Sequence, residues 1–161
     1  MDENKKTVGF TETGRREISA EDHKLLAAAE HASEQAWAPN SGFHVGAALL
    51  LEDGTIVSGN NQENTAYPSG LCAERVAVFY AGAHYPQIKP IRIAVCGYHP
   101  ERKAEEKPAF PCGGCLQVLW EYQQRFNTDL ELLLFNEHKV YRFSDIGQLL
   151  PFAFRLNEPR A

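Results

Sequence analysis

Two short stretches, Cys72-Ala73-Glu74-Arg75 and Pro111-Cys112-Gly113-Gly114-Cys115, decide what this chain is expected to fold around. They form a C-x-E motif followed by a P-C-x-x-C motif, and together they supply three thiols and one carboxylate. Zinc prefers four ligands, and a catalytic zinc site leaves one of the four places to water. Glu74 is poorly placed to be a fourth ligand but well placed to move protons. The stretches therefore predict an open zinc site, with the three cysteines as ligands and Glu74 as the catalytic group.

Both motifs fall where a helix is predicted to begin. Unpaired backbone N–H groups and the helix dipole favour a thiolate at the first turn of a helix, where Cys72 and Cys112 stand. Cys115, one turn later, lies on the same helix face and can reach the same ion. Three thiolates on Zn²⁺ leave a net charge of about −1, which Arg75 can offset by donating hydrogen bonds to the sulfurs. The other interpretation of Arg75 is an ordinary surface arginine.

A structural zinc site is the alternative to a catalytic one, and it needs a fourth protein ligand. Cys96 and His99 are candidates by residue type, but Cys96 stands inside an apolar strand and is expected to be a small core residue. A structural site would also have no use for Glu74. The catalytic interpretation is therefore favoured.

Composition limits the class of protein. With 161 residues and 43% hydrophobic content, one domain with a substantial core is expected. The chain has 16 basic and 21 acidic residues, a net charge of −5, which argues against nucleic acid as the main partner. The N-terminus has no long apolar run, so neither a signal peptide nor a membrane span is expected and the predicted location is the cytoplasm. In that reducing compartment, C-x-x-C with a further cysteine indicates metal binding rather than disulfides.

The order of predicted elements indicates a layered α/β domain. Residues 1–18 are polar, with scattered apolar groups, and are expected to form a mobile or loosely docked arm, leaving 19–161 as a single domain. Helices are predicted from Ser19, an N-cap, to before Pro39, and over 71–83, 111–126 and 145–150; strands are predicted over 43–51, 55–57, 91–98, 130–135 and 139–143. The buried stripe of the 71–83 helix is expected to be Val76, Phe79, Tyr80 and Ala83. Alternating helices and strands predict a sheet covered on both faces.

The two metal motifs together resemble those of the zinc-dependent cytidine deaminases, and more specifically the small homotetrameric class with three cysteine ligands. The resemblance covers residues 20–156. It includes Phe43-His44-Val45-Gly46-Ala47-Ala48, Asn61-Gln62-Glu63-Asn64 and Leu149-Leu150-Pro151-Phe152-Ala153-Phe154, which are similar to F-x-V-G-A-A, N-x-E-N and L-L-P-x-A-F. It implies a three-layer α/β/α sandwich with a mixed five-stranded sheet.

The resemblance also implies substrate contacts. Asn61 and Glu63 would hold the ribose hydroxyls, and Phe43 would pack against the pyrimidine ring. From the residues alone, Phe43 would be interpreted as core, and Asn61 and Glu63 as turn residues.

Other implied contacts involve the base and a neighbouring subunit. The backbone of Ala73 and the loop that contains Thr65 and Tyr67 would contact the base edge. Phe154 would close the pocket of a neighbouring subunit, although from the sequence alone it would be interpreted as core. Each active site of the homotetramer would then be shared between subunits.

The implied reaction is the zinc-dependent hydrolytic deamination of cytidine and deoxycytidine to uridine and deoxyuridine. Zinc lowers the pKa of a water molecule, and Glu74 accepts its proton, protonates ring N3 and passes a proton to the leaving amine. One Zn²⁺ per subunit is the implied cofactor, and a small nucleoside is the implied substrate.

The chain departs from the family pattern at a few positions. Asn40 stands where the family often has Tyr, Leu116 where it has Arg after the last zinc cysteine, and Phe152 where a small residue is common. Residues 67–71 also differ from the usual ones before C-A-E. These departures leave the fine substrate preference open.

Three other functions remain open at this point. They are a deaminase of a modified cytosine nucleoside of the blasticidin type, a deaminase acting on RNA or DNA, and a non-catalytic zinc module for protein interaction. Asn61 and Glu63 favour a free nucleoside over the first, and the acidic balance argues against the second.

Overall fold

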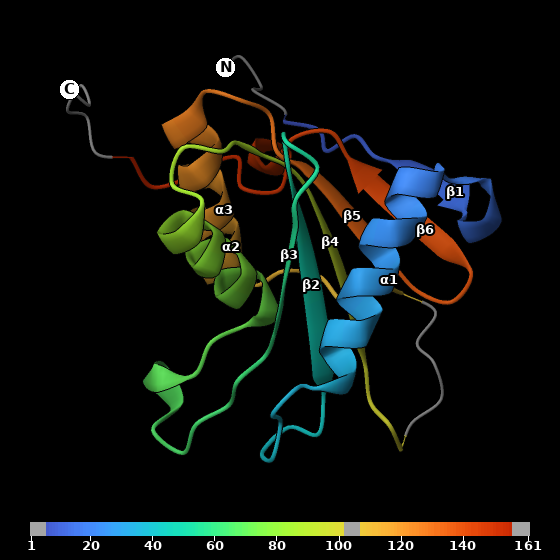
Figure 1. The fold of residues 1–161 in the computed structure, drawn as a ribbon, viewed down its shortest axis with the longest axis vertical. Coiled ribbons are helices and arrows are strands. Elements are labelled where there is room, and N and C mark those ends of the chain that lie inside the picture. The colour runs from blue at the N-terminus through green and yellow to red at the C-terminus, as the bar shows by residue number, and fades with distance from the viewer. Residues whose placement is uncertain (1–5, 102–106, 156–161) are drawn as a thin grey trace, which may run out of the picture.

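A mixed β-sheet forms the middle layer of the protein, with helices on both of its faces (Figure 1). The computed structural model describes residues 6–101 and 107–155. Helix α1 (Ala20–Glu34) covers one face, while α2 (Ala73–His84) and α3 (Gly113–Phe126) lie side by side on the other. The predicted three-layer α/β/α sandwich is confirmed. Within those two ranges, no helix is both long and apolar enough to cross a membrane.

The sheet has six strands in the order β1-β6-β5-β4-β2-β3. Only β4 and β5 are parallel; every other neighbouring pair is antiparallel. The strands are β1 (Thr11–Gly14), β2 (His44–Leu51), β3 (Ile56–Asn60), β4 (Pro90–Tyr98), β5 (Glu131–Phe135) and β6 (Lys139–Phe143). Short 3-10 helices follow at Arg15–Glu17, Tyr67–Ser69 and Ile146–Gln148, the last of them within the predicted 145–150 helix.

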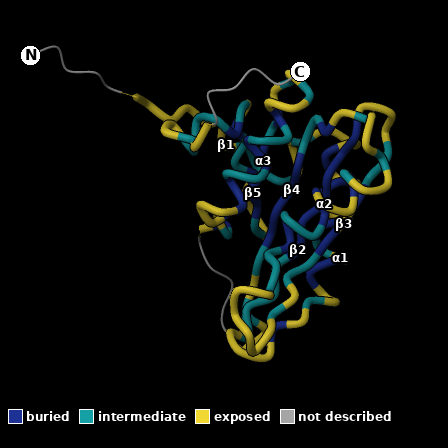
Figure 2. The backbone as a smooth tube through the Cα atoms, turned by 90° about the vertical axis from the view of Figure 1, so that its left-hand side faces the viewer, coloured by how far each residue is buried: buried dark blue, intermediate teal, exposed yellow. Residues whose placement is uncertain are grey.

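Two apolar clusters, one on each side of the sheet, make up the core. Along β2, Ala47, Leu49 and Leu51 face α2 and α3, whereas Ala48 and Leu50 face α1. The buried positions follow the strands and the inner sides of the helices (Figure 2). Each fully buried Leu or Ile contributes about 1.5–3 kcal/mol relative to an exposed one.

Two glycines allow the helices to lie unusually close to the sheet. A Cβ on Gly46 would lie 1.9 Å from the carbonyl oxygen of Ala29 in α1. A Cβ on Gly59 would lie 2.6 Å from the backbone nitrogen of Ala77 and 2.8 Å from the carbonyl oxygen of Ala73, both in α2. Because no side chain fits between them, the first turn of α2 is fixed directly against β3.

The prediction of five strands is wrong by one, since part of the predicted arm belongs to the sheet. Thr11–Gly14 pairs antiparallel with β6, and the ring of Phe10 packs 5.4 Å from Phe143 and 6.0 Å from Tyr141, centroid to centroid. Residues 1–5 of that arm lie outside the described residues. The sequence Thr-Glu-Thr-Gly lacks the apolar alternation by which strands are identified, because this edge strand buries little.

The predicted buried stripe of α2 is also wrong. The positions that pack on the sheet are Ala73, Glu74, Ala77, Val78 and Ala81. Phe79 and Tyr80 are 42% and 49% exposed, and Ala83 is exposed. Close packing against Gly59 requires small side chains on the inner face, so the aromatic residues point outward. Helix α3 buries Cys115 and Leu119.

A nearly buried carboxylate ties α1 to the sheet. Asp22 is 3% exposed and accepts hydrogen bonds from Arg142 at 2.6 Å and from Arg92 at 3.0 Å. Both arginines also pair with Glu131 in β5. Burial by itself would raise the pKa of Asp22, but the hydrogen bond and charge of Arg142 outweigh it and hold the pKa below its usual value.

We therefore expect Asp22→Asn to lower the free energy of unfolding at neutral pH by about 1.5–3 kcal/mol, because it removes charge-assisted hydrogen bonds. A depressed carboxyl pKa stabilises the fold above the unfolded-state pKa and ceases to do so as the pH falls through the folded-state value. The difference between the two proteins should thus shrink on acidification. Urea unfolding at neutral and acid pH measures it. Glu21→Gln, at a carboxylate that is 61% exposed and also contacts Arg92, is the control and should change stability by less than about 1 kcal/mol.

Candidate active site

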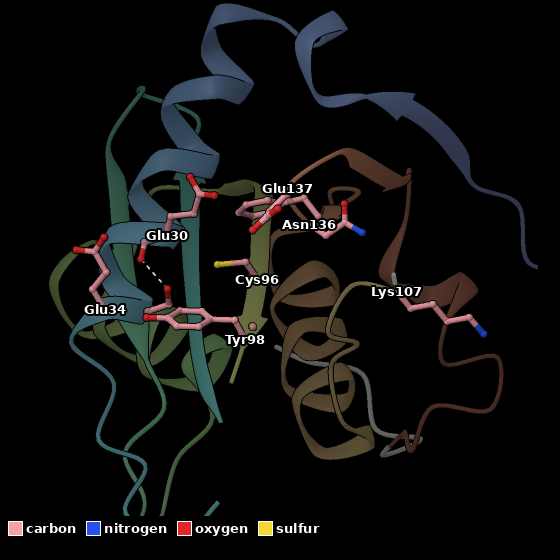
Figure 3. A pocket seen from close by; sticks show the side chains of 10 residues that line it. Glu30, Glu34, Cys96, Tyr98, Lys107, Asn136 and Glu137 are labelled. Atoms are coloured by element: carbon pink, nitrogen blue, oxygen red, sulfur yellow. Dashed lines mark hydrogen bonds between the residues drawn. The ribbon is translucent and has the colours of Figure 1, made fainter. Parts of the chain in front are cut away.

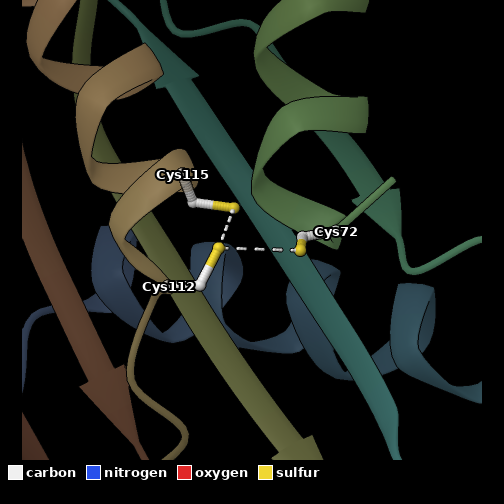
Figure 4. Close-up of side chains that lie close together, drawn as sticks. All are labelled: Cys72, Cys112 and Cys115. Atoms are coloured by element: carbon white, nitrogen blue, oxygen red, sulfur yellow. Dashed lines mark hydrogen bonds between the residues drawn. The ribbon is translucent and has the colours of Figure 1, made fainter. Parts of the chain in front are cut away.

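Three cysteine sulfurs meet where the N-termini of α2 and α3 converge (Figure 4). Cys72 is the N-cap residue of α2, Cys112 is the N-cap residue of α3, and Cys115 lies in the first turn of α3. The Sγ atoms of Cys72 and Cys112 are 4.0 Å apart, and those of Cys112 and Cys115 are 3.5 Å apart. Among the described residues, no other group of three potential metal ligands comes together.

This donor set fits zinc. A tetrahedral ion with Zn–S bonds of about 2.3 Å keeps its sulfur ligands about 3.8 Å apart, and the observed sulfurs all lie within 4.8 Å of one another. The two helix N-termini supply the positive potential that thiolates need. Three residues from the protein leave one place of a tetrahedron for a non-protein ligand.

The electrostatics of the sulfurs reveal why a cation belongs between them. Hydrogen bonding from Cys115 and from Arg75 lowers the pKa of Cys72 to about 5. The pKa of Cys115 is raised, since its thiol donates to the Cys72 thiolate and is buried. Without a cation, ionisation of one sulfur therefore opposes ionisation of the next. A metal ion removes that conflict, and its binding displaces the remaining protons.

No fourth cysteine or histidine completes the cluster within the part of the chain that the structure describes. Cys96 is buried in the apolar cluster on the α1 side of the sheet, as expected of a core residue, and burial raises its pKa to about 11. The ring of His99 lies beside Gly42, outside the sulfur cluster. The two candidates for a structural zinc site are therefore not where that site would need them.

Glu74 lies close enough to Cys72 and Cys115 to interact with them electrostatically, and it is only 3% exposed. It lies on the buried face of the first turn of α2, two residues after Cys72. Burial raises its pKa above the ordinary value for a glutamate. A raised pKa makes a carboxylate a stronger base, which favours its use as a general acid and base.

Arg75, the residue after Glu74, contacts the cluster through its guanidinium. Its Nη2 donates a hydrogen bond to Cys72 Sγ at 3.6 Å, while its buried Nε has no hydrogen-bond partner among the described residues. The guanidinium therefore places a full positive charge against the sulfurs. That charge offsets part of the negative charge of three thiolates.

A cavity of about 160 Å³ adjoins Cys72 and Arg75. A pair of backbone hydrogen bonds brings its walls together, from Gln62 N to Leu71 O at 2.9 Å and from Leu71 N to Gln62 O at 3.0 Å. The chain leaving β3 is thereby paired with the residue before the first zinc cysteine. The lining residues are Asn61, Gln62, Glu63, Asn64, Tyr67, Gly70, Leu71, Cys72 and Arg75. Three of the expected substrate contacts, Asn61, Glu63 and Tyr67, thus lie beside the metal ligands.

The side chains of Asn61 and Glu63 also hold the local backbone. Asn61 accepts a hydrogen bond from Val45 N at 2.8 Å and donates one to Phe43 O at 2.9 Å. Glu63 accepts from Asn40 N at 2.7 Å and from both the N–H and the hydroxyl of Ser41. The hydrogen bond from the Ser41 hydroxyl lowers the pKa of Glu63, which therefore remains a carboxylate. Nothing in the sequence pattern had singled out Ser41.

The other expected substrate contacts do not line this cavity. The ring of Phe43 packs against Gly97, where an added Cβ would lie 2.8 Å from the ring. Ala73 is fully buried, and Thr65 is exposed in the loop between β3 and α2. Phe154 is 67% exposed, with its main chain bonded to Gln117.

A larger cavity, of about 330 Å³, lies between the C-terminal half of α1, the end of β4 and the β5–β6 turn (Figure 3). The sulfur of Cys96 points into it. It contains none of the expected site residues and lies on the α1 face, opposite the cysteine cluster. Size alone therefore does not identify the reaction site, because the metal ligands and the buried acid are elsewhere.

Comparison with known proteins places residues 19–127 in the family described as "Cytidine and deoxycytidylate deaminase zinc-binding region". A cytidine deaminase from Sporosarcina psychrophila is 39% identical over 132 residues, which cover 81% of this chain and 89% of the relative. One from Mycobacterium tuberculosis is 38% identical and covers 81% and 86%. The crystal structure of a cytidine deaminase from Burkholderia pseudomallei matches with a TM-score of 0.70 at 38% identity, covering 85% of this chain and all of that one.

Removing the charge beside Cys72 should weaken metal retention. We expect Arg75→Ala to shift the pH at which zinc is half released upward by about one pH unit, because protons compete better for thiolates that have lost a neighbouring cation. Zinc released across a pH series, measured with a colorimetric chelator, gives that midpoint. Arg75→Lys keeps the charge and should shift it less. An unchanged midpoint in Arg75→Ala would contradict the role given to this residue.

Proposed function

The chain belongs to the family of zinc-dependent cytidine and deoxycytidylate deaminases, and we propose on that premise that it converts cytidine and deoxycytidine to uridine and deoxyuridine with release of ammonia. One observation carries the proposal: a buried glutamate of raised pKa, Glu74, lies beside a three-thiol zinc site with one place left for a non-protein ligand. A non-catalytic zinc module would have no need of a buried acid at that point.

The chemistry is divided between the metal and one carboxylate. Zinc, when bound, supplies the Lewis acidity that makes a water molecule nucleophilic. Glu74 accepts one proton of that water and delivers it to ring N3, which makes C4 electrophilic towards the remaining hydroxide. It then takes the proton of the hydroxyl group now on C4 and carries it to the amino group, so that the C4–N bond breaks, ammonia leaves and the C4 carbonyl forms. One residue can serve both steps because it has given up the first proton before it accepts the second.

The cavity beside Cys72 supports a small polar substrate. Glu63 presents a carboxylate and Asn61 an amide, both suited to ribose hydroxyls, within the walls that also contain the first zinc cysteine. Both side chains also brace the loop before β2, so substrate binding and loop order are linked. Phe43, Ala73, Thr65 and Tyr67 are proposed to surround the base as the resemblance implies. The acidic balance of the chain argues against a DNA or RNA strand as substrate.

We further propose a homotetramer in which neighbouring subunits complete each other's sites. A cavity of about 160 Å³ is smaller than the 300–1,000 Å³ or so of typical small-molecule sites. Phe79 and Tyr80 on α2 and Phe152 and Phe154 near the C-terminus are large exposed apolar groups, which are typical of interfaces. Phe154 is proposed to enter the cavity of a second copy.

Two further expectations remain proposals. Residues 19–161 are proposed to form one catalytic domain, although 102–106 and 156–161 lie outside the described residues. A cytoplasmic location suits a metal site that needs three reduced thiols. Deamination of a modified cytosine nucleoside of the blasticidin type is less favoured, since the relatives compared above are named as cytidine deaminases.

We expect Glu74→Gln to retain zinc and to lose about 10²–10⁴-fold in kcat, because the amide cannot take or deliver a proton. An ultraviolet assay of cytidine loss measures the rate, and metal analysis of the same sample measures zinc. Near-normal turnover with a full complement of zinc would overturn the assignment of Glu74.

Replacing the proposed contact from a second copy should affect substrate affinity more than chemistry. We expect Phe154→Ala to raise KM about threefold to tenfold, because an aromatic contact with the substrate is lost. Zinc content should be unchanged, since Phe154 is not among the cysteines that form the metal cluster. Sedimentation of the same sample shows whether the oligomer is intact, so that a change in KM can be assigned to the lost contact. Phe10→Ala, at an exposed aromatic residue that belongs neither to the cysteine cluster nor to the lining of the cavity beside Cys72, is the matched control for KM.

A further inference from the structure

The side-chain amide of Gln117 forms two hydrogen bonds with a single residue, Phe154. Its Nε2 donates to the carbonyl oxygen of Phe154 at 3.0 Å, and its Oε1 accepts from the backbone N–H of Phe154 at 3.0 Å. A planar amide that satisfies both backbone groups of one residue holds that residue as a neighbouring β-strand would. The main chain of Phe154 is therefore fixed in position and in rotation.

These contacts hold the backbone of Phe154 but leave its ring exposed. The residue is 67% exposed, although its backbone is held at two points. Ordering a terminal segment costs conformational entropy, and burial of its aromatic side chain in this subunit would be the usual compensation. Here the backbone is ordered while the ring stays free for another contact.

Contacts on both sides of Phe154 keep the same segment in place. Before it, the ammonium of Lys6 donates a hydrogen bond to Pro151 O at 2.7 Å and lies 5.2 Å from the ring centre of Phe152. After it, the guanidinium of Arg155 lies 5.0 Å from the ring centre of Trp120 on α3. The N-terminal segment and α3 thus hold the C-terminal segment between them.

From this geometry we propose that Gln117 is a positioning residue, which presents Phe154 of its own subunit to the active site of a second copy of this chain. The inference rests on the proposed function, in which Phe154 acts across the subunit boundary. Gln117 follows Cys115 by two residues on α3. The start of this one helix therefore carries two zinc ligands of its own site, Cys112 and Cys115, together with the amide that holds Phe154 for the neighbouring site. Helix α3 would thus connect the zinc site of one subunit physically to the active site of the next.

The first test is the kinetic effect of Gln117→Ala. It should raise KM about threefold to tenfold, as Phe154→Ala does, with kcat changed less than about twofold and zinc content unchanged. The double variant Gln117→Ala/Phe154→Ala should be no worse than Phe154→Ala alone, because both changes remove the same contact. Gln124→Ala, an exposed glutamine seven residues further along α3, is the control and should leave KM unchanged.

The second test asks in which subunit Gln117 acts. Gln117→Ala chains are co-expressed with Glu74→Gln chains under different affinity tags, and mixed oligomers are purified through both tags. If Gln117 serves the neighbour, sites that keep Glu74 receive Phe154 from intact Glu74→Gln chains, and kcat/KM per Glu74-bearing subunit rises above that of Gln117→Ala alone. If Gln117 acts only on its own zinc site, this value stays at the Gln117→Ala level, and the proposal is overturned.

A parallel mixture of Phe154→Ala with Glu74→Gln separates this inference from the proposed function. Recovery in that mixture without recovery for Gln117→Ala would reject the role of Gln117 and leave the shared site standing. No recovery in either mixture would reject the shared site itself. Additive losses in the double variant, or loss of zinc in Gln117→Ala, would also overturn the proposal, since both indicate a role separate from Phe154.

Discussion

Three sulfur atoms crowded within 4.8 Å of one another are the constraint on which the rest of this structure depends. Negative charge on one sulfur raises the cost of charge on the next, so the cluster needs positive potential from its surroundings and from a metal ion. The N-termini of α2 and α3 supply that potential from the protein, and Arg75 adds a full charge against Cys72. Both helices begin at the sulfur cluster and point their N-termini towards it, which meets this need for positive potential.

The packing that fixes α2 also makes its acid useful. Gly59 lets the backbone of α2 approach β3 so closely that only small groups, such as Ala73 and Ala77, fit the contact. Glu74 lies on the buried face of the same first turn, and the loss of water around it raises its pKa. The close approach of α2 to β3 therefore fixes the turn that carries both Cys72 and the acid proposed to move protons.

Exposed aromatic side chains lie on α2 and in the C-terminal segment, where the proposed subunit contacts would form. The aromatic side chains of α2 face outward because the inner face is reserved for small residues, and Phe154 is held by its backbone with its ring exposed. The side chains of Glu63 and Asn61 form hydrogen bonds with the backbone of the loop before β2 and of the start of β2. Order in that loop is thus maintained by side chains that also line the cavity beside Cys72, and order in the C-terminal segment by a side chain of α3.

Local sequence was enough to predict the three-cysteine cluster, an acid close to Cys72 and the layered α/β architecture. The short spacings hold Cys72 with Glu74 at the start of α2 and Cys112 with Cys115 at the start of α3. The apolar strands could be found because period-two and continuous apolar patterns reflect burial directly. The Ser19 N-cap, whose hydroxyl accepts from Asp22 N, is equally local.

Tertiary structure alone decided the features that depend on what lies opposite. Thr11–Gly14 forms a strand only because β6 offers an unpaired edge, and its own side chains bury too little to leave a pattern. The inner face of α2 is set by Gly59 on another element, so helix periodicity selected the aromatic face that points to solvent. Gln117 meets Phe154 across 37 residues of chain, a pairing that no local rule contains. The sequence by itself determined which groups could do the chemistry, and the packing of distant segments decided which of them are buried, held or presented.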